Sequence, residues 1–230
     1  MTLNFAIAGL LLACHVQAFA TDDKFEYSAP GVLEAAGGQG VKSEEILFPA
    51  MLFPLEAGPA YLNSQVYRPG GGKSTSHEDQ CAKINYSYPW HDNFCETRGF
   101  DTPMCPGGKG HQGQDIRPRT CKKNLHWAVA VEDGIIGHIG TYSVTLQTKH
   151  GTLYRYLHLN MKELEVRSGK LVKAGDRIGK VSNDFGATPT TIHLHFEAKD
   201  SVRWADGNVT TGFLPPYTSL VSSYKKLMGE

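Results

Sequence analysis

The sequence predicts a mainly β protein, an antiparallel β-sandwich or barrel-like domain with long loops held by disulfides. The first observation is compositional: 25 glycines and 12 prolines are spread without a period over 230 residues, which is typical of many turns and short strands. The second is a series of short apolar segments in the C-terminal half, separated by turn signals such as Glu132-Asp133-Gly134. Strands are expected at residues 126–131, 135–141, 143–149, 153–159, 178–182 and 191–198. The one predicted helix covers residues 217–227.

The first 20 residues have the features of a secretory signal peptide. They contain no Asp, Glu, Lys or Arg, and residues 6–13 form an apolar stretch. Ala18-Phe19-Ala20 provides the small residues that a signal peptidase recognises, so we expect cleavage before Thr21. The alternative is a lipoprotein signal, because residues 11–14 loosely fit that cleavage pattern and end in a cysteine, Cys14. The mature protein is therefore expected in the periplasm or outside the cell, and under the alternative it is lipid-anchored through Cys14.

The rest of the chain is predicted to be an arm followed by a single domain. Residues 21–47 are polar and lack periodicity, which predicts an extended N-terminal arm. Residues 48–70 mix apolar residues with prolines, a pattern that suits edge strands and turns. Residues 71–110 are rich in Gly, Ser, Asp and Pro, and a loop of this length is usually functional or held by cross-links. We expect residues 48–230 to form one domain.

Four cysteines remain after the signal peptide, and an even number in an exported chain predicts two disulfides. They are Cys81, Cys95, Cys105 and Cys121. Their spacing lacks the close Cys-x-x-Cys pairs of a structural zinc site. Of the three possible pairings we favour Cys81–Cys95 with Cys105–Cys121, because each of these closes a local loop.

Charge and hydropathy exclude two classes of protein. The chain has 23 Lys and Arg against 23 Asp and Glu, whereas a nucleic-acid-binding protein normally has a basic excess. No apolar run reaches the 18 residues that a membrane-spanning helix needs. We therefore expect neither a nucleic-acid partner nor a permanent transmembrane segment.

Four of the ten histidines have informative neighbours. His111 and Asp115 flank a glycine, and His158 ends a predicted strand. His193 and His195 alternate on another strand, so both point to the same face, about 7 Å apart at Cα. Two imidazoles and a carboxylate form a common catalytic zinc set that leaves a fourth position for water. His111, Asp115 and one of the two strand histidines would supply it, while the other strand histidine and His158 would remain for acid–base chemistry.

Three motifs resemble those of the lysostaphin/LytM-type zinc metallopeptidases, and they occur in the same order. They are His111-Gln112-Gly113-Gln114-Asp115, Tyr156-Leu157-His158-Leu159 and His193-Leu194-His195-Phe196-Glu197. Residues 172–179 resemble the hairpin that precedes the third motif in this family. The resemblance covers about residues 50–200 and is most convincing over 111–198. Departures from the family pattern at residues 71–110, 117–124 and 183–191 concern segments that could border the substrate groove.

The resemblance implies a LytM-type peptidase core and a role for each of five residues. His111, Asp115 and His195 would bind one Zn²⁺ per chain, and His158 and His193 would be the catalytic pair. The activity would be hydrolysis of peptide bonds in bacterial peptidoglycan, in its stem peptides or cross-links, by zinc-activated water. The partners would be peptidoglycan peptides.

The alternative is a non-catalytic LytM-like regulator that activates another cell-wall hydrolase, although a regulator has no physical need of an intact zinc site. Three further features have two interpretations each. Glu197 supports a metal ligand or forms a salt bridge. Tyr88 and Trp90 form the floor of a groove or pack in the loop core. The basic residues 109–123 form a rim for carboxylates or an ordinary solvated face.

Overall fold

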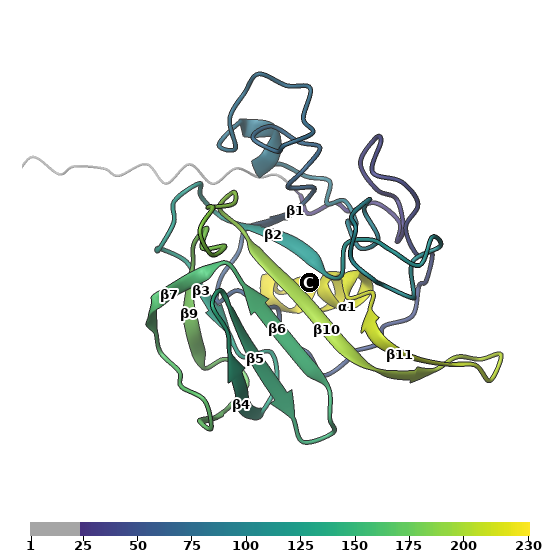
Figure 1. Ribbon diagram of the computed structural model, residues 1–230, viewed down its shortest axis with the longest axis vertical. Coiled ribbons are helices and arrows are strands. Elements are labelled where there is room, and N and C mark those ends of the chain that lie inside the picture. The colour runs from purple at the N-terminus through teal and green to yellow at the C-terminus, as the bar shows by residue number, and fades with distance from the viewer. Residues whose placement is uncertain (1–23) are drawn as a thin grey trace, which may run out of the picture.

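The computed structural model describes residues 24–230, and the predicted signal peptide and Cys14 lie outside this part (Figure 1). The described chain is mainly antiparallel β, which confirms the predicted fold class. Within it, no helix combines the length and hydropathy needed to cross a bilayer.

A large sheet of eight strands contains the site. Its strand order is β1-β2-β10-β6-β5-β4-β8, and β11 pairs with the second half of β10. The strands are β1 (Ala60–Leu62), β2 (Gln114–Pro118), β4 (Gly134–Ile139), β5 (Ser143–Thr148), β6 (Leu153–Leu157), β8 (Leu171–Val172), β10 (Leu194–Arg203) and β11 (Val209–Leu214). A second sheet has the order β3-β9-β7 and consists of β3 (Trp127–Val129), β9 (Arg177–Val181) and β7 (Leu159–Leu164). The main apolar core contains buried residues of both sheets and of α1.

β10 is the central strand for function because β2 pairs with one of its edges and β6 with the other. His195 lies opposite Asp115 on β2 and opposite Leu157 on β6. Along β10, Leu194 and Phe196 are fully buried in the core, whereas His195 points to the other face of the sheet. Pairing with β2 and β6 thus brings together residues that are 38 to 80 positions apart in the sequence.

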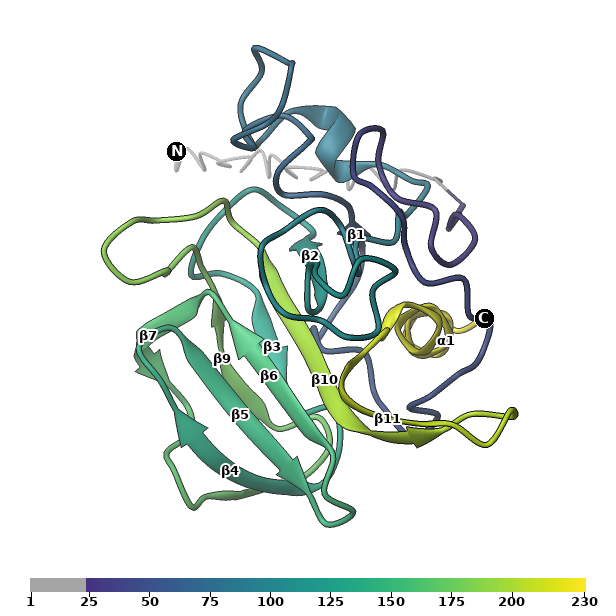
Figure 2. The ribbon, with the colours of Figure 1, turned by 45° about the vertical axis from the view of Figure 1, so that its right-hand side comes forward.

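The predicted end of the strand series at residue 198 is wrong. β10 continues to Arg203 and turns into β11, forming a ribbon that projects from the body of the molecule (Figures 1 and 2). Most of this extension is at least partly exposed, so it lacks the apolar pattern by which the other strands were predicted.

The helix prediction is confirmed: α1 covers Tyr217–Met228. Tyr217, Leu220, Val221 and Tyr224 are buried at the i, i+3, i+4, i+7 spacing of an apolar helix face. Gly229 ends the helix with φ of 83°, and its N–H bonds back to the last turn. A short 3₁₀ helix, η1 (Lys83–Tyr86), is the other helical element in the described chain.

Residues 24–47 fold back on themselves, with Gly31 against Gly40 and Val41, and are held to the domain at several points. Phe25 packs edge-on against Trp90 and Tyr224, with ring centroids 4.7 and 4.8 Å apart. The Gly31 N–H donates to Asp92 Oδ2 at 2.8 Å. Figure 2 shows this segment beside α1.

The favoured disulfide pairing is wrong. The structure pairs Cys81 with Cys121 and Cys95 with Cys105, with Cα–Cα distances of 5.4 and 5.3 Å. The favoured pairing assumed that each disulfide closes a short loop. This assumption failed for Cys81, because strand β2 leads Cys121 to the loop beside η1. The segment after Cys95 folds back on itself, so that Cys105 reaches Cys95 directly.

Candidate functional site

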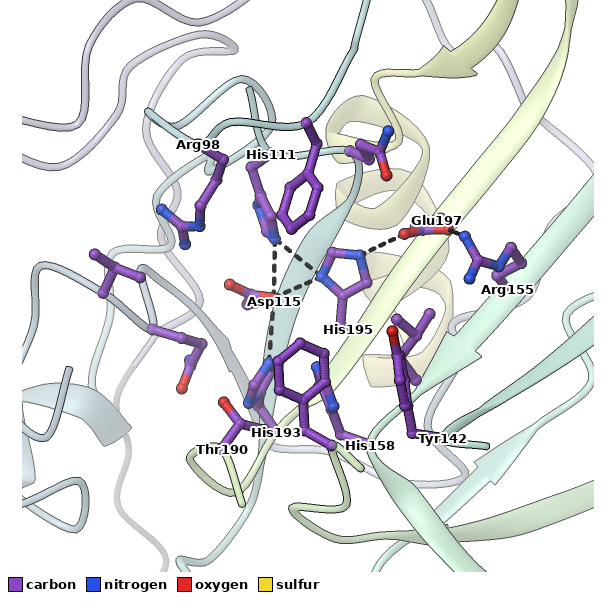
Figure 3. A pocket seen from close by; sticks show the side chains of 16 residues that line it. Arg98, His111, Asp115, Tyr142, Arg155, His158, Thr190, His193, His195 and Glu197 are labelled. Atoms are coloured by element: carbon purple, nitrogen blue, oxygen red, sulfur yellow. Dashed lines mark hydrogen bonds and ion pairs between the residues drawn. The ribbon is translucent and has the colours of Figure 1, made fainter. Parts of the chain in front are cut away.

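Three of the predicted residues meet in one buried cluster (Figure 3). Asp115 lies on β2 and His195 on β10, directly opposite each other, and His111 lies in the turn that leads into β2. His111 Nε2 is 2.9 Å from His195 Nδ1 and 3.2 Å from Asp115 Oδ1. His195 Nδ1 is 3.0 Å from the same carboxylate oxygen. Each residue therefore directs one ligand atom to a common point.

The outer hydrogen bonds of both imidazoles determine which ring nitrogens carry lone pairs. His111 Nδ1 lies 2.8 Å from the Asn93 carbonyl oxygen, which can only accept, so this nitrogen is the N–H. His195 Nε2 likewise donates to the Glu197 carboxylate at 2.9 Å. In the neutral rings, the lone pairs of His111 Nε2 and His195 Nδ1 then face each other and the Asp115 oxygen. A proton or a metal cation between these atoms relieves their mutual repulsion, so the donor set fits a metal ion.

Burial and neighbouring charges act in opposite directions on this cluster. Burial by itself would raise the pKa of Asp115, but His111 and His193 hold it well below its usual range. Burial would lower the pKa of His195, yet hydrogen bonds to Asp115 and Glu197 raise it to about 9. Asp115 therefore stays ionised, and His195 lies beside two carboxylates. Both features favour a positive charge where the three ligand atoms converge.

Gly113 allows the first motif to approach β10 closely. A Cβ atom at this position would lie 2.3 Å from the carbonyl oxygen of Phe196 and 2.9 Å from the side chain of Glu197. Any side chain here would therefore separate the turn from β10 and move His111 away from His195.

His158 and His193 form a second pair beside the cluster, with ring centroids 4.6 Å apart. The Nδ1 of His158 lies 2.9 Å from the Asp184 carbonyl, and that of His193 lies 2.9 Å from the Thr191 carbonyl. Both rings therefore donate through Nδ1 and keep a lone pair on Nε2. His193 Nε2 is 3.4 Å from Asp115 Oδ1.

Burial is the main reason why the pKa of both His158 and His193 lies below the usual range. The two rings are therefore neutral near pH 7. His158 also has φ of 66°, in the left-handed region that non-glycine residues rarely adopt and that is often found at functional sites. This residue interrupts the predicted strand 153–159, which the structure divides into β6 and β7.

Glu197 combines both of its predicted interpretations. One carboxylate oxygen accepts the hydrogen bond from His195, and the other accepts from Arg155 Nη1 at 2.6 Å. Arg155 is the cross-strand partner of Glu197 on β6. The ion pair fixes the carboxylate, which in turn fixes the ring of His195.

These groups open into a cleft of about 340 Å³. It is lined by Gln65, Val66, Arg98, Phe100, His111, Gln112, Asp115, Tyr142, Arg155, Leu157, His158, Phe185, Thr190, His193, His195 and Glu197. All five predicted site residues are among them. Segments 71–110 and 183–191 were expected to border the groove, and each contributes residues to the lining of the cleft. Segment 117–124 was expected there too but contributes no lining residue.

Other candidates lie elsewhere. Trp90 is fully buried in the aromatic core and does not line the cleft. Residues 109–123 supply no Lys or Arg to the cleft; Arg117 is fully buried, with its Nε donating to Asn63 Oδ1 at 3.0 Å. Sequence reasoning missed Arg98, Arg155 and Tyr142. A partial signal existed for Arg155, because a cationic residue opposite Glu197 follows from pairing the two predicted strands.

Comparison with known proteins finds one family that is similar to the segment carrying this site. Residues 109–207 match the family model of peptidase family M23. The match includes all three histidine motifs and confirms the resemblance to lysostaphin/LytM-type peptidases. Residues 109–207 therefore resemble an M23-type peptidase. No curated protein matches the chain.

Several solved structures are similar to part of the chain. The catalytic domain of lysostaphin from Staphylococcus simulans is 21% identical over 60% of this chain and 94% of that chain, with a TM-score of 0.42. A glycyl-glycine endopeptidase LytM from Ruminococcus gnavus is 20% identical over 56% of this chain, with a TM-score of 0.40, and the match spans 54% of its own length. A zinc-containing peptidase from Vibrio cholerae is 25% identical over 46% of this chain and 31% of that chain, with a TM-score of 0.32.

Proposed function

We propose that the protein is a zinc metalloendopeptidase that hydrolyses peptide bonds in bacterial peptidoglycan. The observation that carries this proposal is the convergence of three lone-pair donors from His111, Asp115 and His195, with two neutral histidines beside them in a cleft. The family match over residues 109–207 supports the same reaction class.

The donor geometry suits zinc. Nitrogen and oxygen ligands at about 2.0–2.1 Å from a tetrahedral zinc ion lie about 3.3 Å from one another. The three donor separations here are 2.9, 3.0 and 3.2 Å, close to that value. Three protein ligands leave one position for water or substrate, as in catalytic rather than structural zinc sites.

A bound zinc ion supplies a Lewis acid for the scissile carbonyl and lowers the pKa of water towards about 7. The chain's own residues would then move protons and stabilise charge. His158 and His193 are neutral and carry a lone pair on Nε2, so either can accept a proton from the attacking water. Once protonated, the same ring can donate to the developing oxyanion or to the leaving amine.

We propose an exported location for this activity. Two disulfides among the described residues fit an oxidising compartment outside the cytoplasm, where peptidoglycan is accessible. We also propose that residues 48–230 are the catalytic domain. No residue of the described arm segment 24–47 lines the cleft, so in this conformation the arm leaves the site open.

The test is to incubate purified protein with sacculi and to identify released fragments by mass spectrometry, with and without a chelator. Wild type should carry about one zinc per chain and release peptides only when zinc is present. His195→Ala should lose most of the metal. His158→Ala and His193→Ala should keep zinc and lose at least about 100-fold in turnover, the usual effect of removing an acid–base group.

The same experiment distinguishes the regulator. A regulator would release nothing by itself, and both substitutions would leave its stimulation of a partner hydrolase intact. Wild-type turnover by both variants at matched zinc content would overturn the catalytic assignment.

A further inference from the structure

Arg98 reaches the cleft from a loop that the structure ties closely to the first ligand of the metal-binding cluster. The disulfide Cys95–Cys105 closes this loop. The Cys95 N–H donates to the His111 carbonyl at 3.0 Å, and the His111 N–H donates to the Glu96 carbonyl at 2.9 Å. These two bonds tie the start of the loop that carries Arg98 to His111. The side chains of Arg98 and His111 both line the cleft (Figure 3).

Glu96 anchors the guanidinium. Its carboxylate is fully buried, and its Oε1 lies 2.5 Å from Arg98 Nη1. Neither Glu96 oxygen has another hydrogen-bond partner among the described residues. A buried carboxylate strongly requires a counter-ion. Arg98 Nη1 also donates to the Thr97 carbonyl at 3.3 Å, so one corner of the guanidinium is held by the loop itself.

The remaining corner is available to a ligand. Nε and Nη2 of Arg98 make no hydrogen bond within residues 24–230, and the side chain is 16% exposed and lines the cleft. Arg155, the other arginine of the cleft, is already paired with Glu197. Arg98, whose side chain lines the cleft, therefore keeps N–H donors that a ligand in the cleft can use.

The charge of the cleft indicates which ligand fits. Arg98 and Arg155 are cationic, and Asp115 and Glu197 are anionic. A divalent ion bound by His111, Asp115 and His195 would give the lining of the cleft a net positive charge. A guanidinium with two free N–H groups matches the two oxygens of a carboxylate better than any neutral group.

We propose that Arg98 is a specificity-determining residue that binds a free carboxylate of the peptide substrate close to the scissile bond. This inference rests on the proposed peptidase function and narrows its substrate class to acidic peptides. Phe100, on the same loop, would cover the apolar part of the side chain that carries the carboxylate.

The test uses two synthetic stem peptides that differ only in one group, a free carboxylate or its carboxamide. Wild type should have a kcat/KM about 10- to 100-fold higher for the acid than for the amide, the range expected for a charge-assisted hydrogen bond. Arg98→Gln should remove this preference by lowering only the value for the acid. Arg98→Lys keeps a counter-ion for Glu96, and it should fold normally and lose part of the preference, because an ammonium cannot form the two-pronged contact. Arg167→Gln, an exposed site away from the cleft, is the matched control.

Calorimetric binding of both peptides to the His158→Ala protein, with and without Arg98→Gln, separates this inference from the proposed function. Tighter binding of the acid that depends on Arg98 supports the carboxylate site even if no peptide is cleaved, in which case the peptidase proposal alone fails. Equal cleavage of acid and amide by wild type would overturn the carboxylate site and leave the peptidase intact. An equal loss for both substrates in Arg98→Gln and Arg98→Lys would show a merely structural role.

Discussion

Glu197 gives the sharpest test of how the site holds its metal, because it touches a ligand without being one. Its side chain is almost fully buried, accepts from His195 Nε2 at 2.9 Å and is paired with Arg155 at 2.6 Å. Glu197→Ala would leave the His195 N–H without an acceptor and Arg155 without its partner. The ring of His195 would then be free to rotate and would be a weaker base towards the metal.

The expected effect follows from this geometry. Loss of such an outer hydrogen bond typically weakens metal affinity by about 10- to 100-fold, which corresponds to about 1.4–2.8 kcal/mol. Glu197→Gln keeps an acceptor for His195 Nε2 but removes the charge, so we expect a smaller loss. The order of zinc affinity should therefore be wild type, then Glu197→Gln, then Glu197→Ala.

Competition with a chromophoric chelator at pH 7.5 measures these affinities, and circular dichroism verifies that each variant is folded. Glu165→Ala is a suitable control, because Glu165 is exposed and lies outside the cleft. A folded Glu197→Ala protein whose zinc affinity is within about threefold of wild type would refute the reasoning.

Two further predictions concern the supports of the site. Replacing Cys95 and Cys105 by Ser should lower the free energy of unfolding by about 2–4 kcal/mol and should also weaken zinc binding, because the closed loop is hydrogen-bonded to His111. Removal of the disulfide between Cys81 and Cys121 should lower stability with a smaller effect on zinc binding. Chemical denaturation and zinc titration of the two variants compare these effects. Burial raises the pKa of Asp92 to about 6, although hydrogen bonds from backbone N–H groups oppose the shift. The folded state then binds more protons than the unfolded state between about pH 4 and 6, so this residue should lower stability by about 2–3 kcal/mol as the pH rises through that window. Denaturation of wild type and Asp92→Asn at several pH values should show this slope in wild type alone, and equal slopes would contradict it.

The sequence by itself determined the elements whose patterns are local. Turn residues between short apolar segments predicted most strands of the C-terminal half, and the helix predicted at residues 217–227 is α1. The three histidine motifs also supplied candidate site residues, and i, i+2 alternation places His193 and His195 on one face whatever the rest of the fold does. Imidazole and carboxylate side chains on such a face then indicate a metal ion as its ligand.

The tertiary structure decided everything that depends on which strands become neighbours. Pairing of β10 with β2 sets Asp115 opposite His195, and pairing with β6 sets Arg155 opposite Glu197. The disulfide partners were also decided in three dimensions, since Cys81 and Cys121 are 40 residues apart in sequence and 5.4 Å apart at Cα. Arg98 belongs to no motif and stands out only because the folded loop places its side chain in the lining of the cleft. Such contacts arise from burial of a common core and from backbone pairing, which act between distant segments and leave no periodic trace in the sequence.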